Sequence, residues 1–280
     1  MSVFFSINKR FVKEDKAKIH LTDLGLRRGY AAFDFMRLKE GIPLFIEDHL
    51  DRFETSIKLM DLELSISRNE LKEHVLELIA ANNQKTAGIQ FYLTAGESTD
   101  GVSLAQPNLL ILQVPLPKYS EQLYTKGAKL ISNEFMRDLP EAKSTNYFHA
   151  LRLTKDIKAA NALDVLFKFR GHIYETSRSN IYFVMSDNSI ITAKNNILNG
   201  VVRRNLLRIL PKHFKLKVTD LQESVLEQAN EAFISSTVRE VMPITFIDNK
   251  PIGSGRVGNN VKKIRQIYTK HVNDYIAKHS

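Results

Sequence analysis

The 280-residue sequence contains no cysteine. This absence excludes disulfides, thiolate nucleophiles, cysteine-liganded zinc and iron–sulfur clusters. It fits a reducing compartment, so we expect a cytoplasmic protein. No apolar run approaches the roughly 18 residues that a membrane helix needs, and Lys9 and Arg10 interrupt the apolar start too early for a secretory signal. We expect neither membrane insertion nor export.

Several catalytic and binding motifs are also missing. The eight histidines show no HExxH pair or other ligand spacing, so we expect no metal site. The absence of a GxSxG elbow, a GxxxxGK(S/T) loop and an RNA-binding aromatic signature removes the main sequence support for serine hydrolases, P-loop nucleotidases and RRM proteins. One GxGxxG pattern, at Gly253, Gly255 and Gly258, leaves no room for the second strand of a dinucleotide-binding unit. We interpret it as a turn before the last helix.

The composition is that of an ordinary globular protein. With 43% hydrophobic and 25% charged residues, the chain can bury a core, and its length allows one large domain or two ordinary ones. The formal net charge of +9 favours anionic ligands. Lys and Arg are scattered among acidic residues and form no stripe, so we do not expect a nucleic acid partner.

The first half alternates strand and helix patterns. Glu40-Gly41 predicts a hairpin turn, and Ser67 with Glu70 forms a capping box at a helix start. Pro115, Pro117 and Ser120 break the pattern, so we expect an N-terminal domain over residues 1–117 and a C-terminal domain over residues 118–280. The expected elements are strands Val3–Ile7, Ala31–Leu38 and Pro43–Ile46, helices starting near Asp48 and Ser67, and strands Ile89–Thr94 and Leu109–Val114.

The second half is richer in strands. Arg170-Gly171 predicts a second hairpin turn, and the last segment, Val257–Ala277, places apolar residues up to Tyr275 on one helical face. The other expected elements are strands Ala128–Ser132, Val165–Phe169, His172–Tyr174, Ile181–Met185, Phe233–Ser235 and Val241–Ile247, a helix carrying Phe148, Leu151 and Ile157, and short helices Val202–Leu210 and Gln222–Gln228. The pattern predicts mixed α and β structure in two units.

Six segments, taken in order, carry a family resemblance. They are Gly29–Asp34 (GYAAFD), His49–Phe53 (HLDRF), Glu141–Tyr147 (EAKSTNY), Tyr174–Asn180 (YETSRSN), Ile197–Arg203 (ILNGVVR), and Phe233–Thr237 (FISST) followed by Val241-Met242-Pro243. Together they resemble the fold-type IV pyridoxal-phosphate enzymes, which include branched-chain aminotransferases, D-amino acid aminotransferases and aminodeoxychorismate lyases. The likeness covers nearly the whole chain, and the third and fourth segments carry it most strongly.

The resemblance implies a fold and a set of partners. The fold class would be α+β, a mixed α/β two-domain fold of type IV with a smaller N-terminal α/β domain and a larger, barrel-like C-terminal domain that binds pyridoxal phosphate. The cofactor would be pyridoxal 5'-phosphate, and the substrates an amino acid and a 2-oxo acid. The family also implies a homodimer.

The resemblance assigns the central chemistry to Lys143 and Glu175. Pyridoxal phosphate is an aldehyde, so a neutral amine must attack it. Lys143 would supply this amine and then carry a proton between the substrate Cα and the cofactor C4′. Glu175 would face the pyridine nitrogen, where an anionic carboxylate keeps the ring protonated. Without the resemblance, Lys143 would be one surface lysine among many and Glu175 an ordinary glutamate at a strand edge.

The phosphate would be bound mainly by backbone groups. The N–H groups after Gly200, those of Val201 and Val202, would lie at a helix start, and glycine permits the close approach. Arg52 would add a charged fork, and hydroxyl donors would come from Ser236 and Thr237. Val202 stands where the family often has threonine, so the backbone donors carry more of the binding.

The substrate contacts implied by the resemblance are Phe33, Arg37 and Tyr147. Phe33 stands where branched-chain enzymes have phenylalanine and D-amino acid enzymes have tyrosine. An arginine of the D-amino acid enzymes is replaced by Ala95, and one of the branched-chain enzymes by Gln90, which leaves Arg37 as the cation available for the substrate carboxylate.

We expect an aminotransferase of the branched-chain rather than the D-amino acid type. The alternative is aminodeoxychorismate lyase, which would use the same Lys143 to release pyruvate and 4-aminobenzoate. A relative that binds the cofactor but has lost turnover also stays open.

Overall fold

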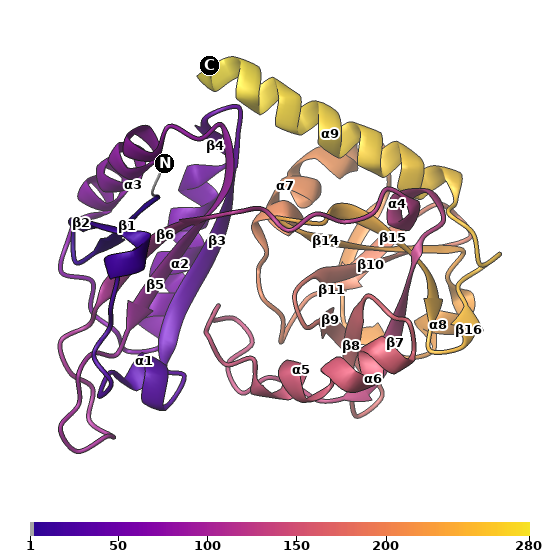
Figure 1. The fold of residues 1–280 in the computed structure, drawn as a ribbon. Helices are drawn as coiled ribbons and strands as arrows, with labels where there is room; N and C mark the ends of the chain where they lie inside the picture. The colour runs from indigo at the N-terminus through magenta and orange to yellow at the C-terminus, as the bar shows by residue number, and fades with distance from the viewer. Residues whose placement is uncertain (1–2) are drawn as a thin grey trace. The chain divides into compact units, whose positions relative to one another are not determined.

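The computed structural model describes residues 3–280, which fall into two compact units (Figure 1). Unit 1 holds the chain up to Pro117, the short segment Ala142–Asn146 and the end Tyr275–Ser280, and unit 2 holds Lys118–Glu141 and Tyr147–Asp274. The chain therefore returns to unit 1 twice. The domains expected from the sequence, residues 1–117 and 118–280, are continuous and do not include these two returns to unit 1. A segment as short as Ala142–Asn146 carries no local sequence signal that shows which unit it packs against.

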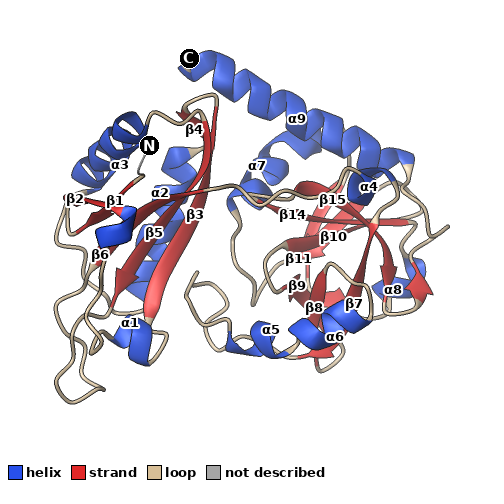
Figure 2. Cartoon of the chain, in the orientation of Figure 1, coloured by secondary structure: helices blue, strands red, loops and turns tan. Residues whose placement is uncertain are grey.

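Unit 1 is built on a six-stranded antiparallel sheet in the order β2-β1-β6-β5-β3-β4. Two helices cover one face of this sheet (Figure 2), and the capping box predicted at Ser67 and Glu70 is confirmed at the second of them. The elements are β1 Phe4–Ile7, β2 Arg10–Lys13, α1 Leu24–Arg27, β3 Ala31–Lys39, β4 Ile42–Pro43, α2 Ile46–Leu59, α3 Arg68–Asn82, β5 Thr86–Thr94 and β6 Leu109–Val114.

The residues of β3 alternate between two environments, as expected for a strand with one covered face. Met36 and Leu38 are fully buried in the core that the sheet forms with α2 and α3, and Asp34 is buried on the same face. Phe33 and Arg37 occupy the other face and are half-buried. Strand pairing sets Phe33 directly opposite Tyr92 of β5, so both rings lie on this second face.

The strand predicted over Pro43–Ile46 is wrong. Strand β4 ends at Pro43, Phe45 adopts a left-handed conformation (φ 54°), and α2 begins at Ile46. The apolar residues after Pro43 are buried at the start of a helix and not in a strand. An apolar run of only four residues does not distinguish a strand from a buried helix start.

Unit 2 is built on a ten-stranded mixed sheet whose main path is β12-β11-β10-β14-β15-β7-β8-β9-β13, with β16 paired to β15. An additional pairing of β9 with β10, at Glu175 and Asn180, closes part of the sheet on itself and confirms a barrel-like region in a mixed α/β fold. The strands are β7 Ala128–Glu134, β8 Asp164–Phe169, β9 His172–Thr176, β10 Asn180–Val184, β11 Ile190–Ala193, β12 Leu216–Thr219, β13 Leu221–Gln222, β14 Glu231–Ser236, β15 Glu240–Ile247 and β16 Lys250–Pro251.

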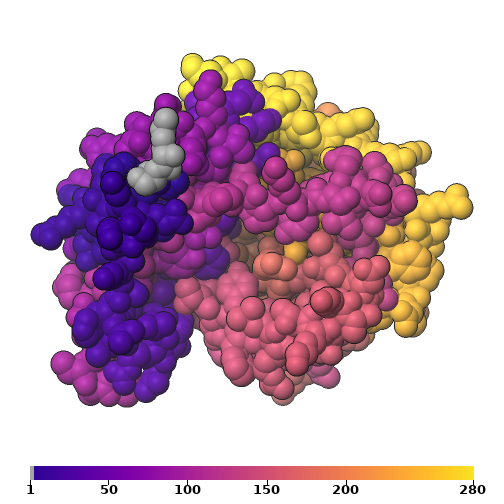
Figure 3. Space-filling view, viewed as in Figure 1, coloured from indigo at the N-terminus to yellow at the C-terminus, as the bar shows by residue number. Residues whose placement is uncertain are grey.

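The helices of unit 2 depart from prediction in two places. The helix expected through Phe148 and Ile157 is two short helices that meet at Leu153, and they lie at the surface seen in Figure 3. The helix expected over Gln222–Gln228 begins only at Val225, because Gln222 belongs to β13. The helices are α4 Gln122–Thr125, α5 Phe148–Arg152, α6 Thr154–Ala159, α7 Val201–Ile209, α8 Val225–Gln228 and α9 Asn259–His279, of which the last turn belongs to unit 1.

The closing helix α9 follows a glycine-containing turn. Gly253 and Gly255 both have positive φ (53° and 68°), so the GxGxxG pattern is a turn before the helix. The predicted apolar face is buried from Val261 to Val272, whereas Tyr275 is half-buried and Ile276 takes the last buried position. Among the described residues, no helix is long and apolar enough to cross a membrane.

Candidate active site

Lys143 is held beside β3 in unit 1 by its backbone. Its carbonyl oxygen accepts a hydrogen bond from the N–H of Phe33 (2.8 Å), and its own N–H donates to Ser56 Oγ (2.9 Å). Two residues on, the N–H of Thr145 donates to the carbonyl of Ala31 (2.9 Å). The segment thus forms a short antiparallel ladder on β3, and Ala142 anchors it by full burial in the core of unit 1. These contacts fix where the lysine side chain starts.

The Lys143 side chain lies against aromatic rings. Its Nζ is 4.1 Å from the centre of the Phe33 ring, within the range of a cation–π contact. Phe33 in turn stacks on Tyr92, with ring centres 5.5 Å apart and planes 16° from parallel. Lys143 is half-buried, and its amine lies against the face of one aromatic ring that is itself stacked on a second.

Arg52, predicted as a phosphate ligand, belongs to a buried cluster on the helical side of β3. Its Nε and Nη2 donate to the two carboxylate oxygens of Asp34 (both 2.7 Å), and His49 Nδ1 lies 2.7 Å from the same carboxylate. Burial alone would raise the pKa of Asp34, but Arg52 and His49 hold it well below its usual value. Burial also lowers the pKa of His49, so its ring is neutral near pH 7.

The Asp34 contact uses only part of the Arg52 guanidinium. Its Nη1 makes no hydrogen bond to any residue from 3 to 280. The Arg52 backbone carbonyl accepts a hydrogen bond from Ser56 Oγ (2.8 Å). Ser56 Oγ in turn accepts the hydrogen bond from the Lys143 N–H. Ser56, which sequence reasoning missed, therefore connects Arg52 to Lys143 within unit 1.

Glu175 lies buried near the end of β9 in unit 2. Its Oε2 accepts from the N–H of Leu198 (3.1 Å) and from Asn180 Nδ2 (3.4 Å), and its Oε1 is 3.4 Å from Arg137 Nε. These contacts fix the orientation of the carboxylate. Sequence reasoning missed Arg137, because nothing local relates it to a strand that begins more than thirty residues later.

The start of α7, here called the Gly200 cup, carries the N–H groups that are predicted to bind phosphate. Gly200 is the N-cap of α7, and no side chain caps the helix. A Cβ on Gly200 would lie 2.4 Å from Asn180 Oδ1, so a larger residue would have to displace the Asn180 side chain. Within the described residues, the N–H groups of Val201 and Val202 donate to no other group. Such a helix start suits a phosphate, and these two N–H groups are the donors expected from the sequence.

The remaining predicted residues divide between the units. Ser236 ends β14 and Thr237 begins the following turn; Ser236 Oγ accepts from the N–H of Arg239 (3.4 Å). Tyr147, the N-cap of α5, is half-buried in unit 2. Arg37 lies two register positions beyond Phe35 on β3, in unit 1. Unit 1 thus gathers Phe33, Arg52 and Lys143, and unit 2 gathers Glu175, the Gly200 cup and the turn after β14.

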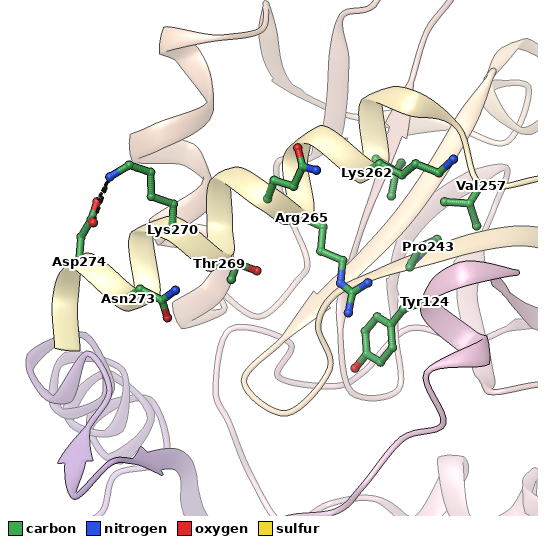
Figure 4. Close-up of a pocket in the computed structure, with 11 residues that line it drawn as sticks. Tyr124, Pro243, Val257, Lys262, Arg265, Thr269, Lys270, Asn273 and Asp274 are labelled. Carbon is green, nitrogen blue, oxygen red and sulfur yellow. Dashed lines mark hydrogen bonds and ion pairs between the residues drawn. The ribbon is translucent and has the colours of Figure 1, made fainter. Parts of the chain in front are cut away.

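A groove in unit 2 lies away from these residues. It has a volume of about 730 Å³ and lies along α9, beside α4 and β15 (Figure 4). Arg265 lies over the Tyr124 ring at 4.3 Å, and Lys270 pairs with Asp274 (2.7 Å). None of its lining residues is a predicted site residue. Within residues 3–280, no group of His, Cys, Asp or Glu could hold a metal ion.

The sequence matches the family model described as amino-transferase class IV over residues 31–247. This chain belongs to the class IV aminotransferase family. The match includes Phe33, Lys143, Glu175 and the Gly200 cup, and it confirms the family expected from the sequence motifs.

Known class IV aminotransferases resemble the chain over nearly its whole length. The D-alanine aminotransferase of Bacillus licheniformis is 28% identical over 273 residues, covering 95% of each chain. A putative branched-chain-amino-acid aminotransferase of Methanocaldococcus jannaschii is 27% identical over 274 residues, covering 93% of each chain. Among solved structures, the branched-chain amino acid aminotransferase from Escherichia coli has a TM-score of 0.87 at 21% identity, covering 97% of this chain and 95% of that one. These relatives support an aminotransferase, leave its substrate type open, and give no support to the lyase alternative.

Proposed function

We propose that this class IV aminotransferase, which uses pyridoxal phosphate, moves an amino group from an apolar amino acid of the branched-chain type to a 2-oxo acid. The observation that carries the substrate assignment is the aromatic platform under Lys143, formed by Phe33 and Tyr92. An apolar surface beside the reactive amine favours an apolar substrate side chain.

Each unit holds groups whose chemistry suits the cofactor phosphate. In unit 2 these are the backbone N–H groups of Val201 and Val202 and the hydroxyls of Ser236 and Thr237. In unit 1 we assign Arg52 Nη1 to the phosphate, as the family resemblance implies. When bound, pyridoxal phosphate supplies an aldehyde carbon and a ring that takes up the electrons of the bond broken at the substrate Cα.

The chain's own residues then perform the proton chemistry. We assign Lys143 Nζ to remove the proton from the substrate Cα and to return it during transfer. Glu175 would accept a hydrogen bond from the protonated ring nitrogen, and its contacts with Arg137, Leu198 and Asn180 orient its carboxylate. Phe33 orients the lysine by contact with its ammonium group.

Ala95 argues against the D-amino acid type. It is fully buried, its N–H donates to the carbonyl of Tyr30 (3.1 Å), and its carbonyl accepts from Ala105 (2.9 Å). It offers no charge where D-amino acid enzymes carry an arginine. We assign the substrate carboxylate to Arg37, on the same face of β3 as Phe33, and place Tyr147 among the substrate contacts.

D-alanine is the second candidate donor, because a curated D-alanine aminotransferase is 28% identical to this chain. A panel of L-leucine, L-isoleucine, L-valine and D-alanine, each with 2-oxoglutarate, separates the two. We expect kcat/KM for the branched-chain donors to exceed that for D-alanine by at least about tenfold. Efficient D-alanine transamination would overturn the substrate assignment and leave the aminotransferase assignment intact.

Arg37 is tested in the same assay. Arg37→Ala should raise the KM for the amino donor roughly tenfold or more and leave the spectrum of the bound cofactor unchanged, because a charged pair with a carboxylate is lost. Lys39→Ala is the matched control, since Lys39 is on the same face of β3. An equal effect of both variants would show that general charge, not Arg37, attracts the substrate.

A homodimer is a further expectation from the family resemblance. Light scattering on the purified protein should give about twice the 32.0 kDa chain mass. A monomeric mass with full activity would contradict it.

A further inference from the structure

A fully buried aspartate in unit 2 has no role in the function proposed above. Asp164 is the first residue of β8 and is 0% exposed. Its Oδ1 accepts from the Ser177 hydroxyl (2.5 Å), and its Oδ2 accepts from the Thr176 hydroxyl (3.3 Å). Thr176 and Ser177 lie at the connection from β9 to β10, so the Asp164 carboxylate accepts two hydrogen bonds from this connection.

The same carboxylate pairs with a buried arginine. Arg239, 2% exposed, donates from Nη1 to Asp164 Oδ2 and also to the Ser179 hydroxyl (3.1 Å). Its Nε donates to the Tyr119 hydroxyl (3.3 Å), and its carbonyl accepts from the Tyr124 hydroxyl (3.2 Å). Arg239 belongs to the turn between β14 and β15, so the ion pair connects two turns that are sixty residues apart in sequence.

Strand register puts these two turns at one end of the sheet. Asn180, the first residue of β10, pairs with Ser235 of β14 on one side and with Glu175 of β9 on the other. Ser236 then pairs with Glu240 across the β14–β15 turn. The residues assigned to the ring nitrogen and to the phosphate hydroxyls therefore flank the turns that Asp164 and Arg239 join.

We propose that Asp164 and Arg239 are positioning residues, which set the turn carrying Ser236 and Thr237 relative to Glu175. This inference rests on the cofactor placement proposed above. The pair touches neither the reacting atoms nor the assigned ligands' polar atoms, apart from the weak backbone contact of Arg239 with Ser236 Oγ (3.4 Å). It acts by restricting how far the two turns can separate.

The geometry of the pair favours positioning over stabilisation alone. A buried ion pair contributes little to stability compared with well-packed apolar residues, because both charges lose their hydration. This pair also leaves Arg239 Nη2 buried with no hydrogen bond to any described residue. What the pair does provide is directional bonds to both turns, through Ser177 and Ser179 on one side and through the Arg239 backbone on the other.

The test uses two variants and a matched control. Ser179→Ala removes one bond between the turns, and Arg239→Gln removes the pair. Ser189→Ala is the control, because Ser189 is also a buried serine but lies at the other end of β10. For each protein, pyridoxal phosphate is titrated into the apoprotein, thermal melting of the apoprotein is recorded, and kcat and KM are measured on the loaded enzyme.

We expect the cofactor dissociation constant to rise about tenfold in Arg239→Gln and about threefold in Ser179→Ala. The absorbance maximum of the bound cofactor should shift, and kcat should fall with little change in the KM for the amino donor. Ser189→Ala should change none of these. Arg239→Lys, which keeps a charge opposite Asp164, should recover part of the affinity. If Arg239→Gln does not fold, Ser179→Ala decides, because it removes a single hydroxyl.

Wild-type cofactor affinity in both Ser179→Ala and a folded Arg239→Gln would overturn the inference, as would an equal loss in Ser189→Ala. The cofactor placement is checked separately with Thr237→Val, which removes a proposed phosphate contact. If Thr237→Val also binds with wild-type affinity, the placement itself fails. If only Thr237→Val binds weakly, the placement stands and the positioning role fails.

Discussion

Each unit holds one arginine against a fully buried aspartate, but the two pairs present the arginine differently. Asp34 takes Nε and Nη2 of Arg52 in a two-point contact, which leaves Nη1 for another partner. Asp164 takes only Nη1 of Arg239, whose Nε is bonded to Tyr119. The atoms that the aspartate occupies decide what the arginine can still do.

This difference underlies the two roles that we propose, a phosphate ligand for Arg52 and a positioning residue for Arg239. Arg52 Nη1 makes no hydrogen bond to any described residue, whereas the nitrogen that Arg239 leaves without one, Nη2, is buried. Both aspartates are charged near neutral pH. Burial alone would raise the pKa of each, but Arg52 with His49 lowers that of Asp34, and Arg239 with Arg178 lowers that of Asp164.

Among substitutions at residues other than Lys143, the largest effect should come from Glu175, which the Asp164–Arg239 pair is inferred to position. Glu175→Gln removes the negative charge opposite the ring nitrogen, so kcat should fall on the order of 10²- to 10³-fold while the cofactor stays bound. Stopped-flow measurement of proton removal from a Cα-deuterated donor checks this. Near wild-type turnover would show that another group meets the ring nitrogen.

The second-largest effect should be a loss of stability when the Asp34–Arg52 pair of unit 1 is broken. Asp34→Asn leaves Arg52 buried beside a neutral group, which typically costs about 3–5 kcal/mol of unfolding free energy. Because the folded-state pKa of Asp34 lies below its unfolded value of 3.8, its contribution is present above that pH and is lost as the pH falls through the lowered pKa.

Urea denaturation at several pH values tests this sign. The unfolding free energy of the wild type should decrease as the pH falls below about 4, and that of Asp34→Asn should decrease less steeply. Parallel curves for the two proteins would mean that other carboxylates carry the acid sensitivity.

Arg52→Gln tests whether Nη1 of this arginine binds phosphate. The cofactor dissociation constant should rise roughly ten- to a hundredfold, because a charge-assisted bond is lost. Arg52→Lys, which keeps the charge but not the two-point contact with Asp34, should lie between. If Arg52→Gln binds the cofactor with wild-type affinity and only its melting temperature falls, Arg52 has a structural role and is not a phosphate ligand. The proposed difference between Arg52 and Arg239 would then be wrong.

The smallest effect is expected at Ser56. Ser56→Ala removes the acceptor of the Lys143 N–H, and the loss of one hydrogen bond should lower kcat about fivefold. Thr55→Ala is the matched control, because Thr55 bonds a carbonyl of the same helix but not Lys143. Equal losses in both variants would indicate a general effect on α2.

Elements with strong local signals were predictable from the sequence. The capping box at Ser67, strand β6 and the closing helix are each specified by neighbouring residues. Short or ambiguous runs were not predictable: the apolar residues after Pro43 read equally well as strand or helix, and β11 and β12 pair only because tertiary structure brings them together.

The site divides in the same way. Lys143, Glu175 and the Gly200 cup lie in recognisable motifs, and local structure at Gly200 depends on its lack of a Cβ. Their supporting residues have no such signal. Arg137 meets Glu175, Asp34 meets Arg52 and Arg239 meets Asp164 across long sequence separations, and a pairing of charges among 71 charged residues cannot be chosen without the fold.

The most direct test of the proposed function is to identify the lysine that reacts with pyridoxal phosphate. The purified protein, loaded with pyridoxal phosphate, is reduced with borohydride, digested and mapped by mass spectrometry, with Lys143→Ala in parallel. We expect a pyridoxyl group on Lys143 alone, no label in the variant, and a loss of transamination in the variant on the order of 10⁴-fold or more. A label on another lysine, or a labelled and active Lys143→Ala protein, would contradict it.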